Sequence, residues 1–469
     1  MQFATNVLDE LRRIVGTQNV LTEKEDLIPY AFDGTAALQQ MPACVVFAST
    51  TREVSSILKL ANQTKTPVVT RGSGTGLSGG SLPVPNCIVL CLVKMDKILE
   101  LDRANLTMLV EPGVTTLGIA DAAAAAGLFY PPDPGSMKIS TIGGNVAENS
   151  GGLRGLKYGV TRNYVMGLEA VLPDGEVVWM GNKCVKDVAG YSLKDVFIGS
   201  EGTLGIITAA VLRLFPKPAE KVTAMAGLSD LEMAPAFFAR VLERAGSCLT
   251  GFEIMPRIGV EFVLKHGSGV RDPFTTPYNW YLLFELSSPF EGEGLTRLAE
   301  RLLEEGLKAG EIDGAIIASS LSQTQELWRL RELMSEVQKH EGGSIKHDVA
   351  VPVAHVPELI ARANQLVELM IPGARPVPFG HLGDGNIHYN VSQPPAMDRA
   401  IFLSYWEALN AAVHEIVLDL GGTINAEHGI GRMKRDLLPH AKQALELELM
   451  REIKSAFDPN GILNPGKLL

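Results

Sequence analysis

Apolar side chains recur along this chain with two spacings, and their order predicts an α+β protein. Residues 5–16 and 51–64 carry apolar side chains at helical spacing. Residues 43–48, 68–69 and 87–92 are short apolar runs, which is typical of buried strands. We therefore expect the chain to begin as a β-α-β unit.

The pattern continues through a second group of strands and ends at a proline-containing stretch. A strand and turn are expected at residues 106–113, an alanine-rich helix at 115–127, and a hairpin at 165–180. Residues 213–218 then close the first domain, which we place at residues 1–218.

The remaining sequence predicts a second domain and a C-terminal segment. Strands such as 280–286 alternate with helical stretches such as 294–306, which is again an α+β pattern. We place this domain at residues 219–420, followed by a C-terminal helical segment at 421–469.

Composition and charge exclude several classes of ligand and cofactor for this chain. The chain has 469 residues, a net charge of −11 and no basic run, which argues against nucleic acid or an anionic membrane surface as a ligand. Its five cysteines never stand as CxxC, so we expect a reduced compartment and no iron–sulfur cluster within the chain. The first residues do not resemble a signal peptide, and no apolar run approaches about 18 residues. The expected location is the cytoplasm, either free or peripheral to the membrane.

The densest chemical signal is the stretch 67–80, where five glycines and four hydroxyl residues occupy fourteen positions. Such a run lets backbone N–H groups converge on a phosphate, and Arg71 would supply a countercharge. Residues 74–79 match GxGxxG, but Pro83 and Pro85 exclude the helix that a dinucleotide fold needs. A flexible linker has a similar composition, but the apolar strands on both sides argue against it.

Three later stretches have a related composition. Residues 131–136 and 140–152 are rich in glycine, serine and asparagine, and residues 199–207 contain three more glycines. With so little room for ordinary side chains, the backbone of the first two must pass close to something flat or charged.

In the second half of the chain, helix and strand periodicity predicts which basic side chains can face a site. Arg329 and Arg331 lie two residues apart in one helix, so only one of them can face a site. Lys346 is expected on a strand at 345–352, on the side that Asp348 shares, where it could face an anion.

Two histidines flank a tight turn. The Gly-Asp-Gly-Asn turn between His381 and His388 would fold the two imidazoles toward each other, and strand alternation places Asn386 and Asn390 on the face of His388. An oxygen ligand from Glu427 would complete a His₂Glu set with an open position, which is the arrangement that catalytic zinc uses.

The stretch Arg71-Gly-Ser-Gly-Thr-Gly-Leu-Ser-Gly79 resembles the pyrophosphate loop of the vanillyl-alcohol oxidase family of flavoproteins. The resemblance runs nearly end to end, and it is strongest to the D-lactate, glycolate and D-2-hydroxyglutarate dehydrogenases. It implies a two-subdomain FAD-binding domain of the PCMH type at 1–218 and an antiparallel-sheet substrate or cap domain at 219–420. The segment 421–469 would return to the FAD domain.

The resemblance assigns FAD contacts to the glycine-containing stretches and to the closing segment. Many relatives attach the flavin through a histidine in the N-terminal domain. No histidine precedes His266 here, so the FAD is expected to be bound without a covalent link. The implied FAD-binding residues are Arg71, Gly72, Ser73, Gly74, Thr75, Gly76, Ser78, Gly79, Pro132, Asp133, Ser136, Thr141, Gly143, Gly144, Asn145, Asn149, Ser150, Gly151, Glu201, Gly202, Gly205, Ile207 and Asn464.

The resemblance also assigns residues to substrate, metal and proton transfer. His428 would take the hydroxyl proton while the Cα hydrogen moves to flavin N5 as hydride. Zn²⁺ is the expected divalent metal, and Mn²⁺ or Fe²⁺ would suit the same donors. The substrate-binding set is Arg331, Ser335 one turn later on the same face, Lys346 and Asn390, and the metal set is His381, His388 and Glu427.

These residues predict FAD- and metal-dependent oxidation of a small D-2-hydroxy acid, with D-lactate ahead of glycolate and D-2-hydroxyglutarate. A non-catalytic flavin-binding electron-transfer subunit would not need the histidine and glutamate set. An oxidase of bulky aromatic alcohols would not need a carboxylate clamp, and the ether-lipid branch carries a His-His-His run that is absent here. Electrons would pass to electron-transfer flavoprotein, an iron–sulfur subunit or a quinone, and a homodimer or a heteromeric complex would fit the sequence.

Overall fold

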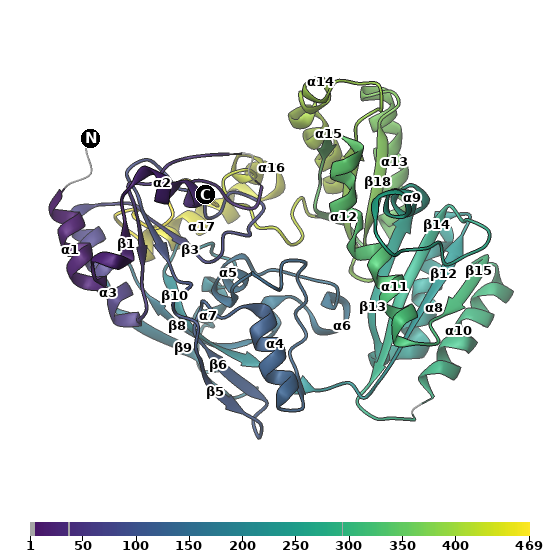
Figure 1. Cartoon of the computed structure of the whole chain (residues 1–469), viewed down its shortest axis with the longest axis horizontal. Coiled ribbons are helices and arrows are strands. Elements are labelled where there is room, and N and C mark those ends of the chain that lie inside the picture. The colour runs from purple at the N-terminus through teal and green to yellow at the C-terminus, as the bar shows by residue number, and fades with distance from the viewer. Residues whose placement is uncertain (1–4, 36–37, 293) are drawn as a thin grey trace. The chain divides into compact units, whose positions relative to one another are not determined.

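The computed structural model describes residues 5–35, 38–292 and 294–469, and the chain forms two compact units (Figure 1). Both units combine helices and sheets, which confirms the predicted α+β class. Unit 1 is built from both ends of the chain. It contains residues 1–152, 159–217 and 427–469, and unit 2 contains residues 153–158 and 218–426.

The first sheet of unit 1 has the strand order β1-β2-β4-β3. Strands β2 and β3 both run parallel to β4, and helix α3 connects β2 to β3, so the predicted β-α-β start is confirmed. The Thr50 side chain caps α3 by accepting a hydrogen bond from the N–H of Glu53. The bounds are α1 Thr5–Val15, β1 Val20–Leu21, α2 Lys24–Leu27, β2 Cys44–Phe47, α3 Thr51–Thr64, β3 Val68–Arg71 and β4 Ile88–Cys91.

The second sheet of unit 1 is antiparallel and has the order β5-β6-β10-β8-β9. Strands β8 and β9 form the predicted hairpin, and β10 is buried along almost its whole length. A two-stranded sheet, β7 with β11, lies apart from it. The bounds are β5 Ile98–Asp102, β6 Thr107–Val110, α4 Thr116–Ala125, β7 Leu128–Phe129, α5 Ile142–Glu148, β8 Val165–Val171, β9 Val177–Gly181, α7 Leu193–Phe197, β10 Ile206–Arg213 and β11 Phe215–Pro216.

The C-terminal part of unit 1 joins the first sheet. Helices α16 (Leu438–Ala441) and α17 (Ala444–Phe457) precede a coil in which Leu463 forms a parallel bridge with Val68 of β3. The Lys454 ammonium donates hydrogen bonds to the carbonyls of Thr203 at 2.7 Å and Leu463 at 2.9 Å. The last residues of the chain are thereby tied to the strand that precedes the glycine loop.

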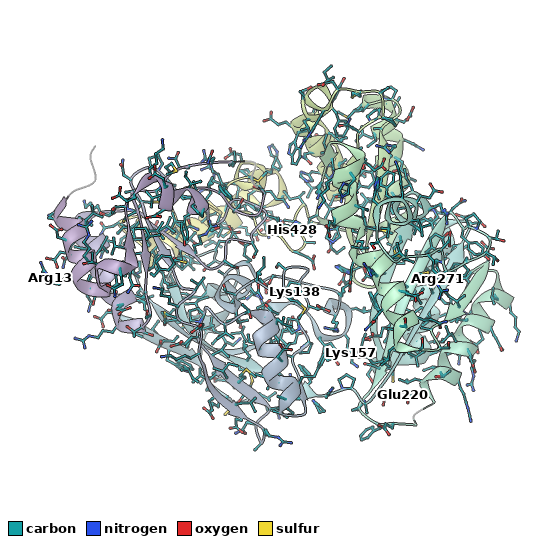
Figure 2. The ribbon with its side chains drawn as sticks, viewed as in Figure 1. Arg13, Lys138, Lys157, Glu220, Arg271 and His428 are labelled. Carbon is teal, nitrogen blue, oxygen red and sulfur yellow. The ribbon has the colours of Figure 1, made fainter. Side chains whose placement is uncertain are left out.

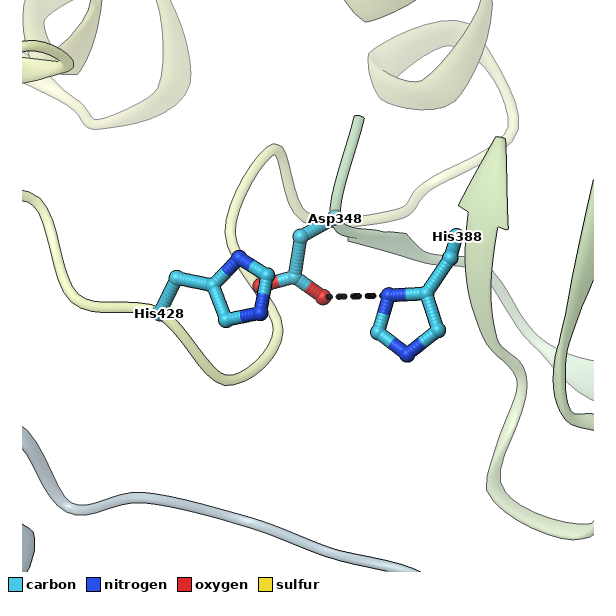
Figure 3. Close-up of side chains that lie close together, drawn as sticks. All are labelled: Asp348, His388 and His428. Carbon is cyan, nitrogen blue, oxygen red and sulfur yellow. Dashed lines mark ion pairs between the residues drawn. The ribbon is translucent and has the colours of Figure 1, made fainter. Parts of the chain in front are cut away.

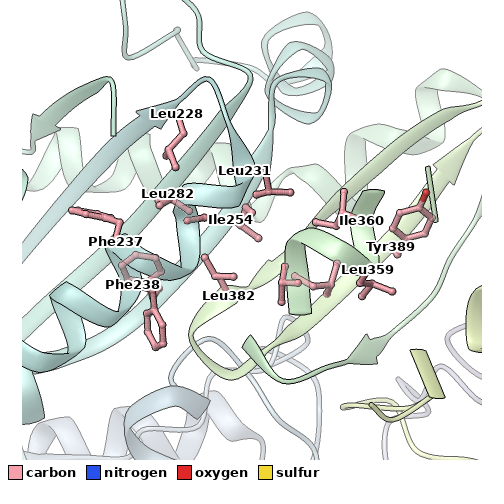
Figure 4. Close-up of a cluster of buried hydrophobic side chains, with 14 of the residues drawn as sticks. Leu228, Leu231, Phe237, Phe238, Ile254, Leu282, Leu359, Ile360, Leu382 and Tyr389 are labelled. Atoms are coloured by element: carbon pink, nitrogen blue, oxygen red, sulfur yellow. The ribbon is translucent and has the colours of Figure 1, made fainter. Parts of the chain in front are cut away.

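Unit 2 is built on one antiparallel sheet with the order β15-β12-β14-β13-β18-β19-β16, and β17 pairs with β19. Along β12 and β14, alternate side chains point to two separate cores. Helices α8, α10, α13 and α15 cover the larger core, part of which Figure 4 shows, and α9, α11 and α12 cover the smaller one.

The elements of unit 2 include the strand and the helix that the sequence analysis used as examples. The strand expected at 280–286 is β14, and the helix expected at 294–306 is α10. The bounds are α6 Gly155–Tyr158, β12 Glu220–Leu228, α8 Ala234–Ala245, β13 Leu249–Pro256, α9 Arg257–His266, β14 Trp280–Ser288, α10 Leu295–Ala309, β15 Gly314–Ile317, α11 Leu321–Glu332, α12 Met334–Val337, β16 Ser344–Ile345, β17 Val349–Ala350, α13 Val356–Met370, β18 Arg375–His381, β19 Asn386–Ser392, α14 Arg399–Leu403 and α15 Trp406–Asp419.

None of the helices in the described ranges combines the length and the apolar character that crossing a membrane requires. All five cysteines are free thiols, and Cys184 is the exposed one.

Candidate active site

The glycine loop after β3 is fixed by an acid that the sequence analysis missed. Residues 72–82 are coil and turn, as the prolines predict, and Gly74 and Gly79 have φ of +74° and +78°. The buried Asp33 carboxylate accepts a hydrogen bond from the N–H of Gly79 at 2.7 Å. Of the predicted loop residues, Ser78 and Gly79 are buried, Gly72, Gly74, Thr75 and Gly76 are half-buried, and Ser73 is exposed.

Arg71, the expected countercharge, bonds to backbone carbonyls. Its guanidinium donates to Phe32 at 2.7 Å and to Pro29 at 3.4 Å, and it lies 5.6 Å from the centroid of the Tyr30 ring. Burial lowers the pKa of Arg71. The side chain therefore braces the loop against residues 29–32, and its contact with FAD stays a prediction.

Several buried polar atoms in and near this loop suit a phosphate-bearing ligand. Within the part of the chain that the structure describes, they have no hydrogen-bond partner, and buried polar groups normally have one. Burial also lowers the pKa of one of them, the Lys467 ammonium, to about 8. Hydroxyl and ammonium groups can donate to phosphate oxygens, and an amide oxygen can accept from a ribose hydroxyl, so these residues fit FAD. The atoms are the hydroxyls of Thr70, Ser78 and Ser81, the amide oxygen of Asn464 and the ammonium of Lys467.

The second glycine-containing stretch forms α5 and the coil on both sides of it. The Asn145 amide donates to the Thr116 hydroxyl at 2.6 Å, and Asn149 ends the helix at φ +54° while its side-chain oxygen accepts from the N–H of Arg162 at 2.9 Å. Both asparagines thus stabilise the local fold. The other predicted residues here are buried or half-buried: Pro132, Asp133, Ser136, Thr141, Gly143, Gly144, Ser150 and Gly151.

Glu201 connects the third stretch to the C-terminal segment. Its buried carboxylate accepts hydrogen bonds from the N–H groups of Ile430 and Gly431, each at 2.7 Å, and its backbone carbonyl accepts one from Asn464 at 2.6 Å. Burial raises the pKa of the Glu201 carboxyl. From Glu201, the predicted residues Gly202, Gly205 and Ile207 lead into β10.

A further acid of unit 1, Glu148, packs against the glycine loop. A Cβ added at Gly76 or Gly80 would come within 3.3 Å or 3.0 Å of its Oε1, so a side chain at either position would press against the Glu148 carboxyl group. Burial and the nearby Glu201 and Asp33 carboxylates raise the pKa of Glu148 well above its usual range. The loop is therefore packed against a carboxyl group that holds its proton more strongly than an exposed one does.

In unit 2, the predicted histidines converge. Strand β18 ends at His381, a single 3₁₀ turn follows, and β19 begins at Asn386, which pairs with His381 in the ladder. The ring centroids of His381 and His388 are 5.7 Å apart, as the turn predicts. Alternation along β19 places Asn386, His388 and Asn390 on one face, opposite the residues that enter the larger core.

Each of the two histidines faces a buried carboxylate through Nδ1. His381 Nδ1 lies 2.6 Å from Glu253 Oε1, and His388 Nδ1 lies 3.7 Å from Asp348 Oδ1 (Figure 3). Metal-binding histidines commonly donate one ring N–H to a carboxylate, and the other nitrogen then binds the metal. In both rings that nitrogen would be Nε2, so the donor set fits a divalent ion. Asn386 supports the arrangement by donating to Asp348 at 3.0 Å.

Arg331 belongs to the same group of side chains. It is 7% exposed, whereas Arg329 is on the exposed side of α11, so one arginine of the pair faces inward as predicted. Its Nε donates to Glu253 Oε2 at 2.6 Å, and its guanidinium lies 4.7 Å from the centroid of the Phe379 ring. This hydrogen bond uses Nε, so two Nη groups remain suited to a carboxylate.

The continuous strand expected at 345–352 is wrong, because the structure interrupts it at Lys346. The sequence analysis places Lys346 within a continuous strand, but β16 ends at Ile345 and β17 begins at Val349. The buried His347 ring bonds to the carbonyl of Tyr389 at 2.6 Å and interrupts the ladder at this point. Lys346 is exposed, and its contact with substrate stays a prediction.

The expected position of Ser335 is also wrong. Helix α11 ends at Glu332, and Ser335 belongs to the separate short helix α12. Because the helical turn is interrupted, Ser335 is exposed whereas Arg331 is buried, and the two do not share a face.

Glu427 and His428 lie on the coil between the last residue of unit 2, Ala426, and α16 (Figure 2). The N–H of Ala426 donates to the Asp348 carbonyl at 3.3 Å. Within unit 1, Glu427 packs against Gly151, where an added Cβ would stand 2.5 Å from Glu427 Oε1. Glu427 and His428 are both half-buried.

Comparison with known proteins identifies both halves of the chain. A family model described as "FAD binding domain" matches residues 42–181, and one described as "FAD linked oxidases, C-terminal domain" matches residues 217–468.

Curated relatives match nearly the whole chain. "Glycolate oxidase subunit GlcD" of Bacillus subtilis is 37% identical, covering 99% of this chain and 96% of its own length. "D-2-hydroxyglutarate dehydrogenase" of Stutzerimonas stutzeri is 34% identical, with 98% of each chain covered. "D-lactate dehydrogenase" of Archaeoglobus fulgidus is 38% identical, with 98% and 99% covered.

Among solved structures, p-cresol methylhydroxylase with substrate bound has the same fold, with a TM-score of 0.79 at 20% identity. The alignment covers 99% of this chain and 96% of that one. The family resemblance read from the motifs is confirmed.

Proposed function

Because this chain belongs to the FAD-linked oxidase family, we propose that it oxidises a small D-2-hydroxy acid, with D-lactate as the expected substrate, to the 2-oxo acid. The observation that carries the proposal is the group in unit 2 in which two histidines, each facing a buried carboxylate, lie beside the inward-facing Arg331. Glycolate and D-2-hydroxyglutarate are the alternative substrates, since relatives with these names match as fully as the lactate enzyme.

His381, His388 and Glu427 are proposed to hold a divalent metal, with Zn²⁺ expected. Glu427 follows Ala426, and consecutive Cα atoms are about 3.8 Å apart. The hydrogen bond from Ala426 to the Asp348 backbone therefore anchors the chain beside a residue whose carboxylate faces His388. A metal ion bound there would favour ionisation of the substrate hydroxyl, and FAD when bound accepts a hydride at N5.

The residues of this chain would orient the substrate and remove its proton. The Nη groups of Arg331 suit the planar carboxylate of a hydroxy acid, and Asn390 lies on the same strand face as His388. Fixing the carboxylate would restrict the Cα–H bond to one direction, which favours one enantiomer. His428 would accept the hydroxyl proton as the hydride leaves.

The proposal predicts a clear substrate preference. In steady-state assays with an artificial electron acceptor, kcat/KM for D-lactate should exceed that for L-lactate by about 10²-fold or more, because the inverted centre cannot present both its hydroxyl and its hydrogen correctly. A panel of D- and L-2-hydroxy acids checks this. A preference for D-2-hydroxyglutarate or glycolate would select an alternative substrate, and the absence of flavin reduction by every acid would refute the proposal.

The electrons are proposed to leave through another protein or a quinone. The glycine loop does not open a helix, as a nicotinamide fold would require, and the cysteines have no cluster spacing. Substrate-reduced enzyme mixed in a stopped-flow instrument should be reoxidised quickly by a quinone analogue, an iron–sulfur protein or electron-transfer flavoprotein, and slowly by NAD⁺ and oxygen. Fast reoxidation by NAD⁺ would contradict this, and fast reoxidation by oxygen would indicate an oxidase.

A further inference from the structure

Glu253 is a charged residue in a place where sequence and packing favour an apolar one. It lies in the middle of β13 and is 0% exposed, and its neighbours Phe252 and Ile254 belong to the larger core. Strand β13 pairs with β18 through Ile254 and Gly380, so Glu253 stands beside the end of the strand that carries His381. A buried carboxylate is costly unless both of its oxygens have partners.

Those partners are two of the predicted site residues. Glu253 Oε1 accepts from His381 Nδ1 at 2.6 Å, and Oε2 accepts from Arg331 Nε at 2.6 Å. The two donors and the two acceptor oxygens are therefore matched one to one.

We infer that Glu253 is a positioning residue that orients a metal ligand and the substrate-binding arginine together. This inference rests on the proposed function, in which His381 binds the metal and Arg331 the substrate carboxylate. With Nδ1–H held by Glu253, His381 presents Nε2 to the metal. With Nε held by the other oxygen, Arg331 keeps both Nη groups for the substrate. Loss of this one carboxylate should impair both functions.

The variant Glu253→Gln distinguishes this role from simple packing. Glutamine keeps the shape of the side chain but replaces one acceptor oxygen with an NH₂ donor. An amide has one acceptor and one donor end, so either His381 or Arg331 must face an N–H group. We expect Zn²⁺ affinity, measured by competition with a chelator, to fall by about 10- to 100-fold, the usual effect of losing a carboxylate partner of a metal-bound histidine. KM for the best acid of the substrate panel should rise as well, while the flavin spectrum stays unchanged.

Glu285→Gln is the matched control. Glu285 is also buried, at 8% exposure, and lies on the adjacent strand β14, but its partners are Lys221 and Thr250. This variant should keep wild-type Zn²⁺ affinity. Glu253→Asp keeps the charge on a shorter side chain and should bind Zn²⁺ more tightly than Glu253→Gln.

If Glu253→Gln does not fold, the expected cause is the buried charge of Arg331, which no longer has a carboxylate partner. The double variant Glu253→Gln with Arg331→Met removes that charge. Its Zn²⁺ affinity is then compared with that of Arg331→Met alone, and the same 10- to 100-fold loss is expected. The inference would be overturned if Glu253→Gln bound Zn²⁺ as tightly as wild type, or if the double variant bound it as tightly as Arg331→Met. This conclusion requires that wild-type enzyme and His388→Ala still differ in metal content. A wild-type enzyme that binds no metal would instead overturn the metal site of the proposed function.

Discussion

Replacing His428 by alanine is expected to slow flavin reduction by about 10²- to 10⁴-fold, the usual contribution of a general base. The hydroxyl of a 2-hydroxy acid is a weak acid, so hydride transfer requires a group that accepts its proton as the C–H bond breaks. His428 is half-buried on a coil rather than packed in a core, so its removal should leave both units folded.

Anaerobic stopped-flow reduction of the FAD by the best substrate measures this effect directly. His428→Ala should retain FAD and metal at wild-type levels, which distinguishes lost chemistry from a lost cofactor. His440→Ala, an exposed histidine in α16 of the same unit, is the control and should reduce flavin at the wild-type rate. A wild-type rate in His428→Ala would assign proton removal to another group.

The metal content should fall from about one ion per chain to nearly none when His388 is replaced by alanine. Two ligands cannot hold a divalent ion as three do, and the change also leaves the buried Asp348 without its ring partner. Elemental analysis of purified protein provides the measurement, with flavin absorbance as the internal reference for folded chains.

The exposed His355 offers a matched control for this experiment, because it lies in the same unit and pairs with Glu358 at the surface. His355→Ala should keep the wild-type metal content. Equal metal content in wild-type and His388→Ala proteins would remove His388 from the site, and the hydroxyl group would then need another source of activation.

The local geometry of the candidate site was predictable where neighbouring residues determine it. The turn between His381 and Asn386 and the alternation along β19 follow from glycine placement and from strand periodicity, and the structure confirms both. That only one of Arg329 and Arg331 faces inward follows from their spacing in one helix, whereas the choice of Arg331 came from its position in the family motif. Each of these features depends on contacts within about ten residues.

Features that depend on distant partners were not predictable in this way. Glu253 and His381 are 128 positions apart, and no periodic pattern in the sequence indicates their pairing, although an acid in the apolar run 249–256 is itself unusual. Lys346 and Ser335 were misplaced because a buried histidine and a helix end interrupt patterns that continue in the sequence. Asp33 likewise reaches the glycine loop across 46 residues.

The parallel bridge between Leu463 and Val68 has a consequence for synthesis on the ribosome. The strand that leads into the glycine loop is translated early, but residues that hydrogen-bond around it follow 384 positions later, as with Asn464 and Gly80. Unit 1 therefore cannot complete its fold until residues 427–469 have been translated, whereas nearly all of unit 2 has been translated before that point. We therefore expect FAD to bind after residues 427–469 have been translated, and the waiting N-terminal part of unit 1 to be the part most exposed to aggregation.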